Sequence, residues 1–179
     1  EYYNMSTQLP NQGDLKNVYF YFARIAEPQQ KWQTTGDAEK EYTVAVVVSQ
    51  EQYKEFTSIY PKKKTTPLTN EEFTEKYKTE PPFPAQPLQY VLKFKQRAFK
   101  KDGNPIHDSI RPKVYQFIDG VQTDITNTLI GNGSRGTLRY SVWVPTNNPT
   151  LGPTTNLYAV LVTDLVKYDK PDPNAFSPE

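Results

Sequence analysis

Residues Gln89 to Phe99 have the sequence QYVLKFKQRAF, and this stretch decides the predicted fold class. Apolar and charged side chains alternate along it, and successive side chains of a strand point to opposite faces of a sheet. One face would carry Tyr90, Leu92, Phe94 and Ala98, and the other Lys93, Lys95, Arg97 and Phe99. The alternation predicts a half-buried strand whose outer face is cationic.

Five further stretches have the composition of strands, so the chain is predicted to be mainly β. They are dense in β-branched and aromatic residues and comprise residues 18–26, 41–48, 112–118, 135–144 and 156–168. The second of them ends in five consecutive apolar residues, Val44 to Val48. Such a run is typical of a strand that is buried on both faces.

Two short helices are predicted between the early strands. Ser49 with Gln52, and Thr69 with Glu72, have the capping-box spacing, in which each side chain satisfies a free amide of the other residue. Pro61 is expected to stop the first helix, and the second should end near Lys78. Their expected buried faces are Tyr53, Phe56 and Ile59 in the first helix, and Phe73 and Tyr77 in the second.

The remaining segments are expected to be connections within one domain. Residues 27–40 have a loop composition, and residues 80–87, with four prolines, favour a stiff extended connector. Short connections make antiparallel pairing the default. We place the domain at residues 17–169, between flexible segments at 1–16 and 170–179. Residues 1–4 precede the only methionine, Met5, and are interpreted as an addition ahead of the natural start.

The composition excludes several kinds of chemistry. The 179 residues include no cysteine and one histidine, so thiol nucleophiles, zinc–thiolate sites and multi-histidine metal sites are ruled out. We expect no catalytic activity and no cofactor or metal. The longest apolar runs are far too short to cross a bilayer, and no signal-peptide pattern appears. The sequence therefore predicts a soluble intracellular protein.

The net charge of +1 conceals an uneven distribution. Between Pro82 and Pro145 nine cations oppose four carboxylates, a net charge of +5, so the rest of the chain carries −4. Three of the predicted strands place cations and aromatic rings on one face, which gives a basic surface with exposed rings. For any single strand, the charged face is more simply explained as a surface exposed to solvent.

Cations interleaved with aromatic rings match the chemistry of single-stranded nucleic acid, which offers a phosphate per nucleotide and unpaired bases that can stack. The predicted phosphate contacts are Lys93, Lys95, Arg97, Arg111, Lys113, Arg135 and Arg139. The predicted stacking residues are Trp32, Phe99, Tyr115 and Trp143. Among these, Arg139 and Trp143 form the strongest predicted pair, because they share a face of one strand four residues apart.

Other motifs have more ordinary interpretations. Gly131-Asn132-Gly133-Ser134 lacks the lysine and the helix of a phosphate-binding loop, so it favours a tight turn between strands. For the run Lys62 to Lys64, an ordinary solvent-exposed charged segment is favoured about two to one over a phosphate-binding segment. His107 beside Asp108 has no neighbouring nucleophile motif and is interpreted as an exposed residue near a turn.

Three segments resemble a known family. They are RPKV at residues 111–114, IGNGS at residues 130–134 and DLVKY at residues 164–168. In order and spacing they resemble the single-stranded DNA-binding proteins encoded by tailed bacteriophages. The match covers about residues 87–168, which is under half of the chain.

The resemblance implies an oligonucleotide/oligosaccharide-binding (OB) fold, a Greek-key β-barrel, here with two inserted helices. It implies sequence-nonspecific coating of unwound DNA during phage replication and recombination, in the cytoplasm of a bacterial host. A homodimer is one further expectation. Such proteins end in an acidic tail with a terminal aromatic residue that contacts phage replication proteins. Residues 169–179 contain Phe176 but no acidic run, so the tail either has been removed or is lacking in this member.

Two other classes remain open from the residues alone. A carbohydrate- or peptide-binding β module could also use exposed aromatic rings, but its binding would depend little on salt. In a structural virion protein, the same rings and the proline-rich connectors would serve assembly contacts.

Overall fold

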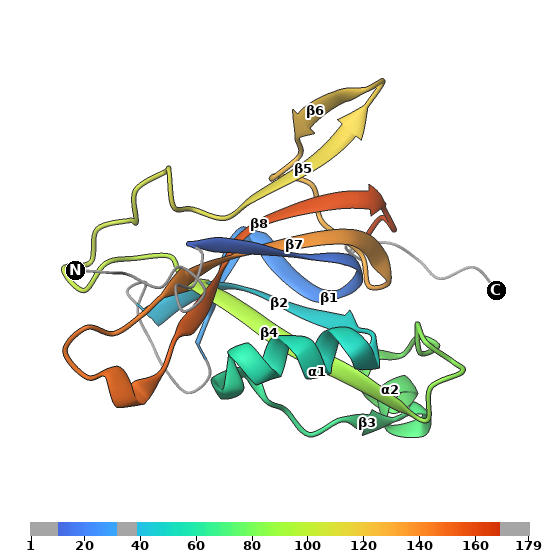
Figure 1. Ribbon diagram of the computed structural model, residues 1–179. Coiled ribbons are helices and arrows are strands. Elements are labelled where there is room, and N and C mark those ends of the chain that lie inside the picture. The colour runs from blue at the N-terminus through green and yellow to red at the C-terminus, as the bar shows by residue number, and fades with distance from the viewer. Residues whose placement is uncertain (1–10, 32–38, 169–179) are drawn as a thin grey trace.

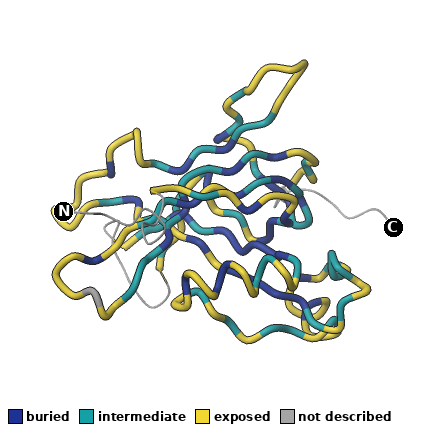
Figure 2. Tube along the Cα trace, viewed as in Figure 1, coloured by how far each residue is buried: buried dark blue, intermediate teal, exposed yellow. Residues whose placement is uncertain are grey.

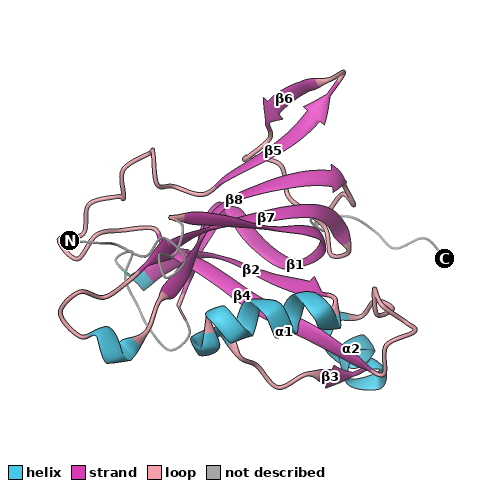
Figure 3. Ribbon diagram, in the orientation of Figure 1, coloured by secondary structure: helices cyan, strands magenta, loops and turns pink. Residues whose placement is uncertain are grey.

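The computed structural model describes residues 11–31 and 39–168, and Figure 1 shows their arrangement. Eight strands in these ranges form one sheet in the order β3-β4-β2-β1-β7-β8-β5-β6. Their bounds are β1 (Gln12–Gln30), β2 (Lys40–Val48), β3 (Leu68–Thr69), β4 (Leu88–Arg97), β5 (Lys113–Ile118), β6 (Val121–Asp124), β7 (Ser134–Trp143) and β8 (Thr154–Asp164). All six predicted strands are present, together with the short β3 and β6, so the mainly β prediction is confirmed (Figure 3).

The sheet curls around a single large core. Strands β4 and β7 are three places apart in the sheet, yet the rings of Phe94 and Tyr140 stack with their centroids 6.1 Å apart. The same core contains Val18 of β1, Val46 of β2 and Val160 of β8, all buried. Figure 2 shows buried segments along the strands in the middle of the molecule. Side chains from both halves of the sheet therefore meet inside an OB-like barrel.

The two predicted helices form where expected, as α1 (Gln50–Ile59) and α2 (Asn70–Tyr77). Both capping boxes are complete: the amide of Gln52 donates to Ser49 Oγ at 3.1 Å, and that of Glu72 donates to Thr69 Oγ1 at 3.1 Å. Two short 3-10 turns, η3 (Pro61–Lys63) and η4 (Pro149–Leu151), were not predicted. Neither α-helix in the described ranges is long and apolar enough to cross a membrane.

The predicted buried face of α1 is wrong at one position. Phe56 and Tyr60 are 4% and 2% exposed, but Ile59 is 45% exposed. At 3.6 residues per turn, Ile59 lies about 100° around the helix axis from Tyr60, so both cannot face the barrel. The aromatic ring of Tyr60, which follows the helix, takes the inner position. Phe73 and Tyr77 of α2 are buried as predicted, in a second cluster between α2 and the outer face of the sheet.

Strand β1 is longer than the sequence predicts at both ends. Residues 12–17, expected to be flexible or just outside the strand, continue β1, where Gln12 pairs with Ser141 of β7. Residues 27–30, expected to be loop, also belong to β1, where Gln30 pairs with Lys40 of β2. Backbone pairing to two neighbouring strands holds these polar residues, and composition does not reveal such long-range partners.

One strand pair corrects the antiparallel expectation. Strand β5 runs parallel to β8, with Lys113 opposite Ala159 and Tyr115 opposite Leu161. The chain between them contains β6 and β7, so the connection is long enough for the crossover that a parallel pair needs. The β5–β6 hairpin projects beyond the barrel (Figure 1).

Candidate nucleic-acid interface

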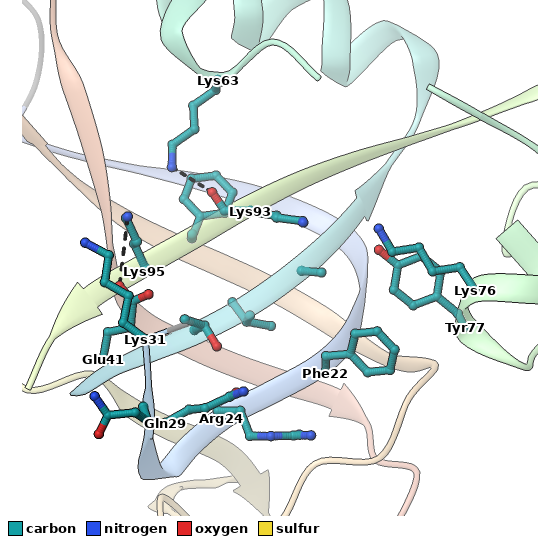
Figure 4. Close-up of a pocket in the computed structure, with 15 residues that line it drawn as sticks. Phe22, Arg24, Gln29, Lys31, Glu41, Lys63, Lys76, Tyr77, Lys93 and Lys95 are labelled. Carbon is teal, nitrogen blue, oxygen red and sulfur yellow. Dashed lines mark hydrogen bonds and ion pairs between the residues drawn. The ribbon is translucent and has the colours of Figure 1, made fainter. Parts of the chain in front are cut away.

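The outer faces of β4, β2 and β1 form a hollow with a volume of about 590 Å³. Its floor is made of small side chains, because Ala45 and Thr43 of β2 lie opposite Lys93 and Lys95 of β4. Arg24 of β1 lies opposite Thr43 on the other side. Cationic side chains thus stand on both sides of a low floor (Figure 4).

A second hollow continues the first toward the end of β7. The two share Lys31, Glu41 and Lys95, and the second is also lined by Arg97 and Trp143. We call the two hollows together the basic groove. Among the described residues, its charged lining consists of the cations Arg24, Lys31, Lys40, Lys63, Lys76, Lys93, Lys95 and Arg97, and the carboxylates Glu39 and Glu41. Eight cations against two carboxylates make the groove a site for a polyanion.

The cations of β4 remain available to a ligand. Lys93, Lys95 and Arg97 are all exposed. The Lys95 ammonium lies 3.9 Å from the Glu41 carboxylate, which is the outer limit of an ion pair, and the lysine side chain is 60% exposed. Such a contact contributes little and does not hold the ammonium away from an incoming phosphate.

Exposed aromatic rings lie at both ends of the basic groove. Phe22 is 41% exposed beside Tyr77, on the side opposite Lys31 and Glu41 (Figure 4). Trp143, 59% exposed, lines the far hollow. Large exposed rings beside cations are suited to stacking on unpaired bases.

Lys63 is a partly buried cation of the basic groove. Its ammonium donates to the carbonyl oxygen of Lys93 at 2.6 Å and lies 4.7 Å from the centre of the Phe94 ring. Burial, followed by repulsion from the ammonium groups of Lys95 and Lys62, lowers the pKa of Lys63 to about 8. This lysine can therefore change its charge near neutral pH.

A phosphate in the groove should favour the charged form of Lys63 and raise its pKa, so binding takes up a proton above pH 8. We expect the affinity for oligo-dT to fall between about pH 7 and about pH 9, by at most about tenfold per pH unit. Fluorescence anisotropy at several pH values checks this. A Lys63→Arg variant, which stays charged, should lose the dependence. An equal fall in both proteins would contradict the role of Lys63.

A separate hollow on the outer face of β7, β8 and β5 holds Arg111, Lys113, Tyr115 and Arg139. Besides Lys16, its cations Arg111, Lys113 and Arg139 already have hydrogen-bond partners. Arg139 donates from Nε and Nη2 to the two carboxylate oxygens of Asp14, at 2.8 and 3.0 Å, and this hydrogen-bonded pair lowers the pKa of Asp14. Lys113 Nζ donates to the Asp108 carbonyl at 2.7 Å and lies 3.3 Å from its carboxylate. This face is therefore less cationic than the basic groove.

The remaining predicted site residues lie outside the basic groove, and most of them have structural contacts. Arg111, although it lines the hollow on β7, β8 and β5, donates to the carbonyls of Ile25, Ala26 and Pro112 and stacks over the Tyr42 ring at 4.8 Å. Arg135 lies against Tyr19, and Phe99 packs against the barrel core. Trp32 falls outside the described residues.

The structure therefore regroups the predicted site. Lys93, Lys95, Arg97 and Trp143 come together in the basic groove, whereas Arg139 lies in the other hollow, apart from Trp143. Sequence reasoning did not select the ring of Phe22 or five of the lining cations, which are Arg24, Lys31, Lys40, Lys63 and Lys76. A signal was present for Arg24, which lies in a predicted strand, but an irregularity between Tyr21 and Arg24 shifts the alternation there.

Comparisons with known proteins bear on the fold. No protein-family model matches the sequence, and no curated protein shows significant similarity to it. Among solved structures, the single-stranded DNA-binding protein from bacteriophage Enc34 is 13% identical, with a TM-score of 0.48 over 93% of this chain and 87% of that one. A structure of that protein in complex with single-stranded DNA is 14% identical, with a TM-score of 0.48 over 90% and 89%.

The single-stranded DNA-binding protein gp2.5 encoded by bacteriophage T7 is 16% identical, with a TM-score of 0.50. The similarity covers 94% of this chain and 98% of that chain, so it extends over nearly all of both. At this identity the likeness bears on fold alone. It confirms the OB-like prediction: the chain has the fold of a bacteriophage single-stranded DNA-binding protein.

Proposed function

We propose that the protein binds single-stranded DNA along the basic groove, without sequence specificity. The observation that carries this proposal is the groove itself, in which eight cations oppose two carboxylates within residues 11–31 and 39–168, above a floor of Thr43 and Ala45. A small floor lets the backbone of a single strand lie close to the sheet. The flanking ammonium and guanidinium groups then neutralise its phosphates.

The lack of sequence preference follows from the kind of contact. Six of the eight groove cations are lysines, which bind phosphates as point charges whatever base is attached. Exposed rings such as Trp143 stack on any base, because every base has a flat π face. The OB-like fold shared with gp2.5 of bacteriophage T7, named as a single-stranded DNA-binding protein, supports the same assignment.

The biological role we propose is coating of unwound DNA during phage replication and recombination, in the cytoplasm of a bacterial host. The protein would act by binding alone, without catalysis. Contacts with phage replication proteins, and a homodimer, belong to the same proposal. These roles go beyond DNA binding. Evidence against any one of them would leave the proposed binding of single-stranded DNA intact.

The test is fluorescence anisotropy of labelled oligo-dT, with a duplex of equal length as competitor. We expect tight binding at low salt, a steep loss of affinity as salt is added, and weak competition by the duplex. Binding that does not respond to salt would favour a carbohydrate- or peptide-binding module instead. Absence of binding at micromolar protein would overturn the proposal.

Replacing Trp143 by alanine should weaken oligo-dT binding by about 1 to 3 kcal/mol, since its ring is expected to stack on a base. Because the ring is 59% exposed, the melting temperature should change little. Phe117→Ala is the matched control, since that ring is 55% exposed on β5, outside the basic groove. Equal effects of the two substitutions on affinity would exclude a stacking role for Trp143.

A further inference from the structure

Phe22 has a backbone conformation that bulky residues avoid. Its φ angle is 51°, in the left-handed region where a side chain with a Cβ is strained. The strain falls where the β1–β2 pairing changes register, between Tyr21 and Arg24. A conformation of this kind costs free energy and persists only where its surroundings impose it. Phe22 is therefore a position where backbone strain points to a role.

A side chain far away in the sequence imposes this conformation. The Phe22 amide donates to Asn132 Oδ1 at 2.8 Å. Asn132 belongs to the tight turn at residues 131–134, which is itself fixed: the Gly133 amide donates to the Phe20 carbonyl at 2.9 Å, and the Gly131 amide to the Val166 carbonyl at 2.7 Å. The turn predicted from the glycine-rich motif thus anchors Asn132 beside the bend in β1.

The strained conformation exposes the ring rather than burying it. Phe22 is 41% exposed and belongs to neither buried cluster of the described residues. Its ring lies 4.9 Å from that of Tyr77, at an interplanar angle of 37°, and Tyr77 is only 2% exposed. Phe22 is therefore the outermost ring of an aromatic stack that continues into the protein beneath α2.

The surroundings of the Phe22 ring match a nucleotide. The ring lines the basic groove together with Arg24 and Lys76 (Figure 4). Core packing does not require an exposed ring held by a strained backbone, whereas a flat apolar surface beside two cations can accept a base and its phosphates. A base paired in a duplex has no free face to offer, so this surface favours unpaired bases.

We propose that Phe22 is a stacking platform for an unpaired nucleobase, and that Asn132 is the positioning residue that holds it in place. The inference rests on the proposed binding of single-stranded DNA in the basic groove. It gives the Gly131–Ser134 turn an indirect role in binding: the turn does not line the floor of the groove, but its Asn132 holds Phe22, which does line the groove.

The test compares oligo-dT with an abasic oligomer of equal length, which has the same phosphates and no bases. Phe22→Leu keeps an apolar side chain but removes the flat ring, and should weaken oligo-dT binding between about 5-fold and 150-fold. Its affinity for the abasic oligomer should change less than about twofold, since the phosphate contacts remain. Phe22→Tyr, which keeps a ring, should bind oligo-dT like the original protein.

Asn132→Ala should produce the same selective loss, because the Phe22 amide loses its acceptor. In the Phe22→Leu and Asn132→Ala double variant the loss should not exceed that of the single variants, since both act on one ring. Asn132→Asp keeps an acceptor oxygen for the Phe22 amide. This variant should keep the original ratio between the affinities for oligo-dT and for the abasic oligomer. Its added charge would affect both equally. Circular dichroism checks that each variant is folded.

The outcomes separate this inference from the proposed function. If the original protein binds neither oligomer, the proposed function fails. If it binds both, and Phe22→Leu leaves the affinity for oligo-dT unchanged or weakens both oligomers equally, the stacking platform is excluded. Additive losses in the double variant would exclude Asn132 as the positioning residue.

Discussion

A triple variant that replaces Lys93, Lys95 and Arg97 by alanine is expected to lose most of its affinity for single-stranded DNA. Each phosphate contact on a single strand contributes about 0.7 to the slope of log affinity against log salt, so the slope should fall by about 2. Counterion release alone then predicts a loss of roughly 500-fold at about 50 mM salt and about 30-fold at about 200 mM. Anisotropy titrations with oligo-dT measure both quantities.

A control variant removes the same charge from outside the groove. Lys54, Lys100 and Lys101 are exposed and line neither hollow of the basic groove. Replacing all three by alanine should leave the salt slope unchanged. If both triple variants lowered affinity equally, overall charge rather than the basic groove would be responsible. Because Lys93, Lys95 and Arg97 are exposed, their replacement should not unfold the protein, so unfolding would not explain a loss of DNA affinity.

Replacing Phe56 by alanine is expected to lower the free energy of unfolding by about 3 to 5 kcal/mol. Phe56 is 4% exposed, and its ring packs against Tyr60, Phe94 and Tyr140 with centroid distances of 4.8, 5.8 and 5.1 Å. Those rings come from the end of α1, from β4 and from β7, so a cavity here weakens the closure of the barrel. Such a loss is a large fraction of the roughly 5 to 15 kcal/mol that stabilise a domain.

Urea denaturation measures this loss, and the same helix supplies the control. Ile59→Ala removes an apolar side chain that is 45% exposed, and should cost less than about 1 kcal/mol. If the two substitutions were equally destabilising, Ile59 would lie in the core, as the sequence predicted, and the described packing of α1 would be wrong.

The local features of the fold could be predicted from the sequence. The two faces of β4 follow from the alternation between Leu92 and Arg97, and both capping boxes follow from residues three positions apart. Burial of β2 on both faces follows from its continuous apolar end. Each of these depends on neighbours within one element, where periodicity carries the information.

The composition of the groove depends on contacts between distant residues, which periodicity does not reveal. Arg139 and Trp143 share a strand, but Asp14 of β1 binds Arg139, while the curl of the sheet brings Trp143 toward Arg97 of β4. The Phe22 amide donates to Asn132 Oδ1, 110 residues away. The alternation of the late strands predicted a basic, aromatic surface, but which cations share one surface is set by how the barrel closes.

The central claim is that a single strand of DNA occupies the basic groove, and the fluorescence of Trp143 reports on this directly. A Trp32→Phe variant retains Trp143 as its only tryptophan. Titration with oligo-dT at low salt should quench that fluorescence, and added salt should restore it as the phosphate contacts dissociate. If fluorescence stayed constant and single strands were not retarded on a gel at micromolar protein, the groove would not be a DNA-binding site.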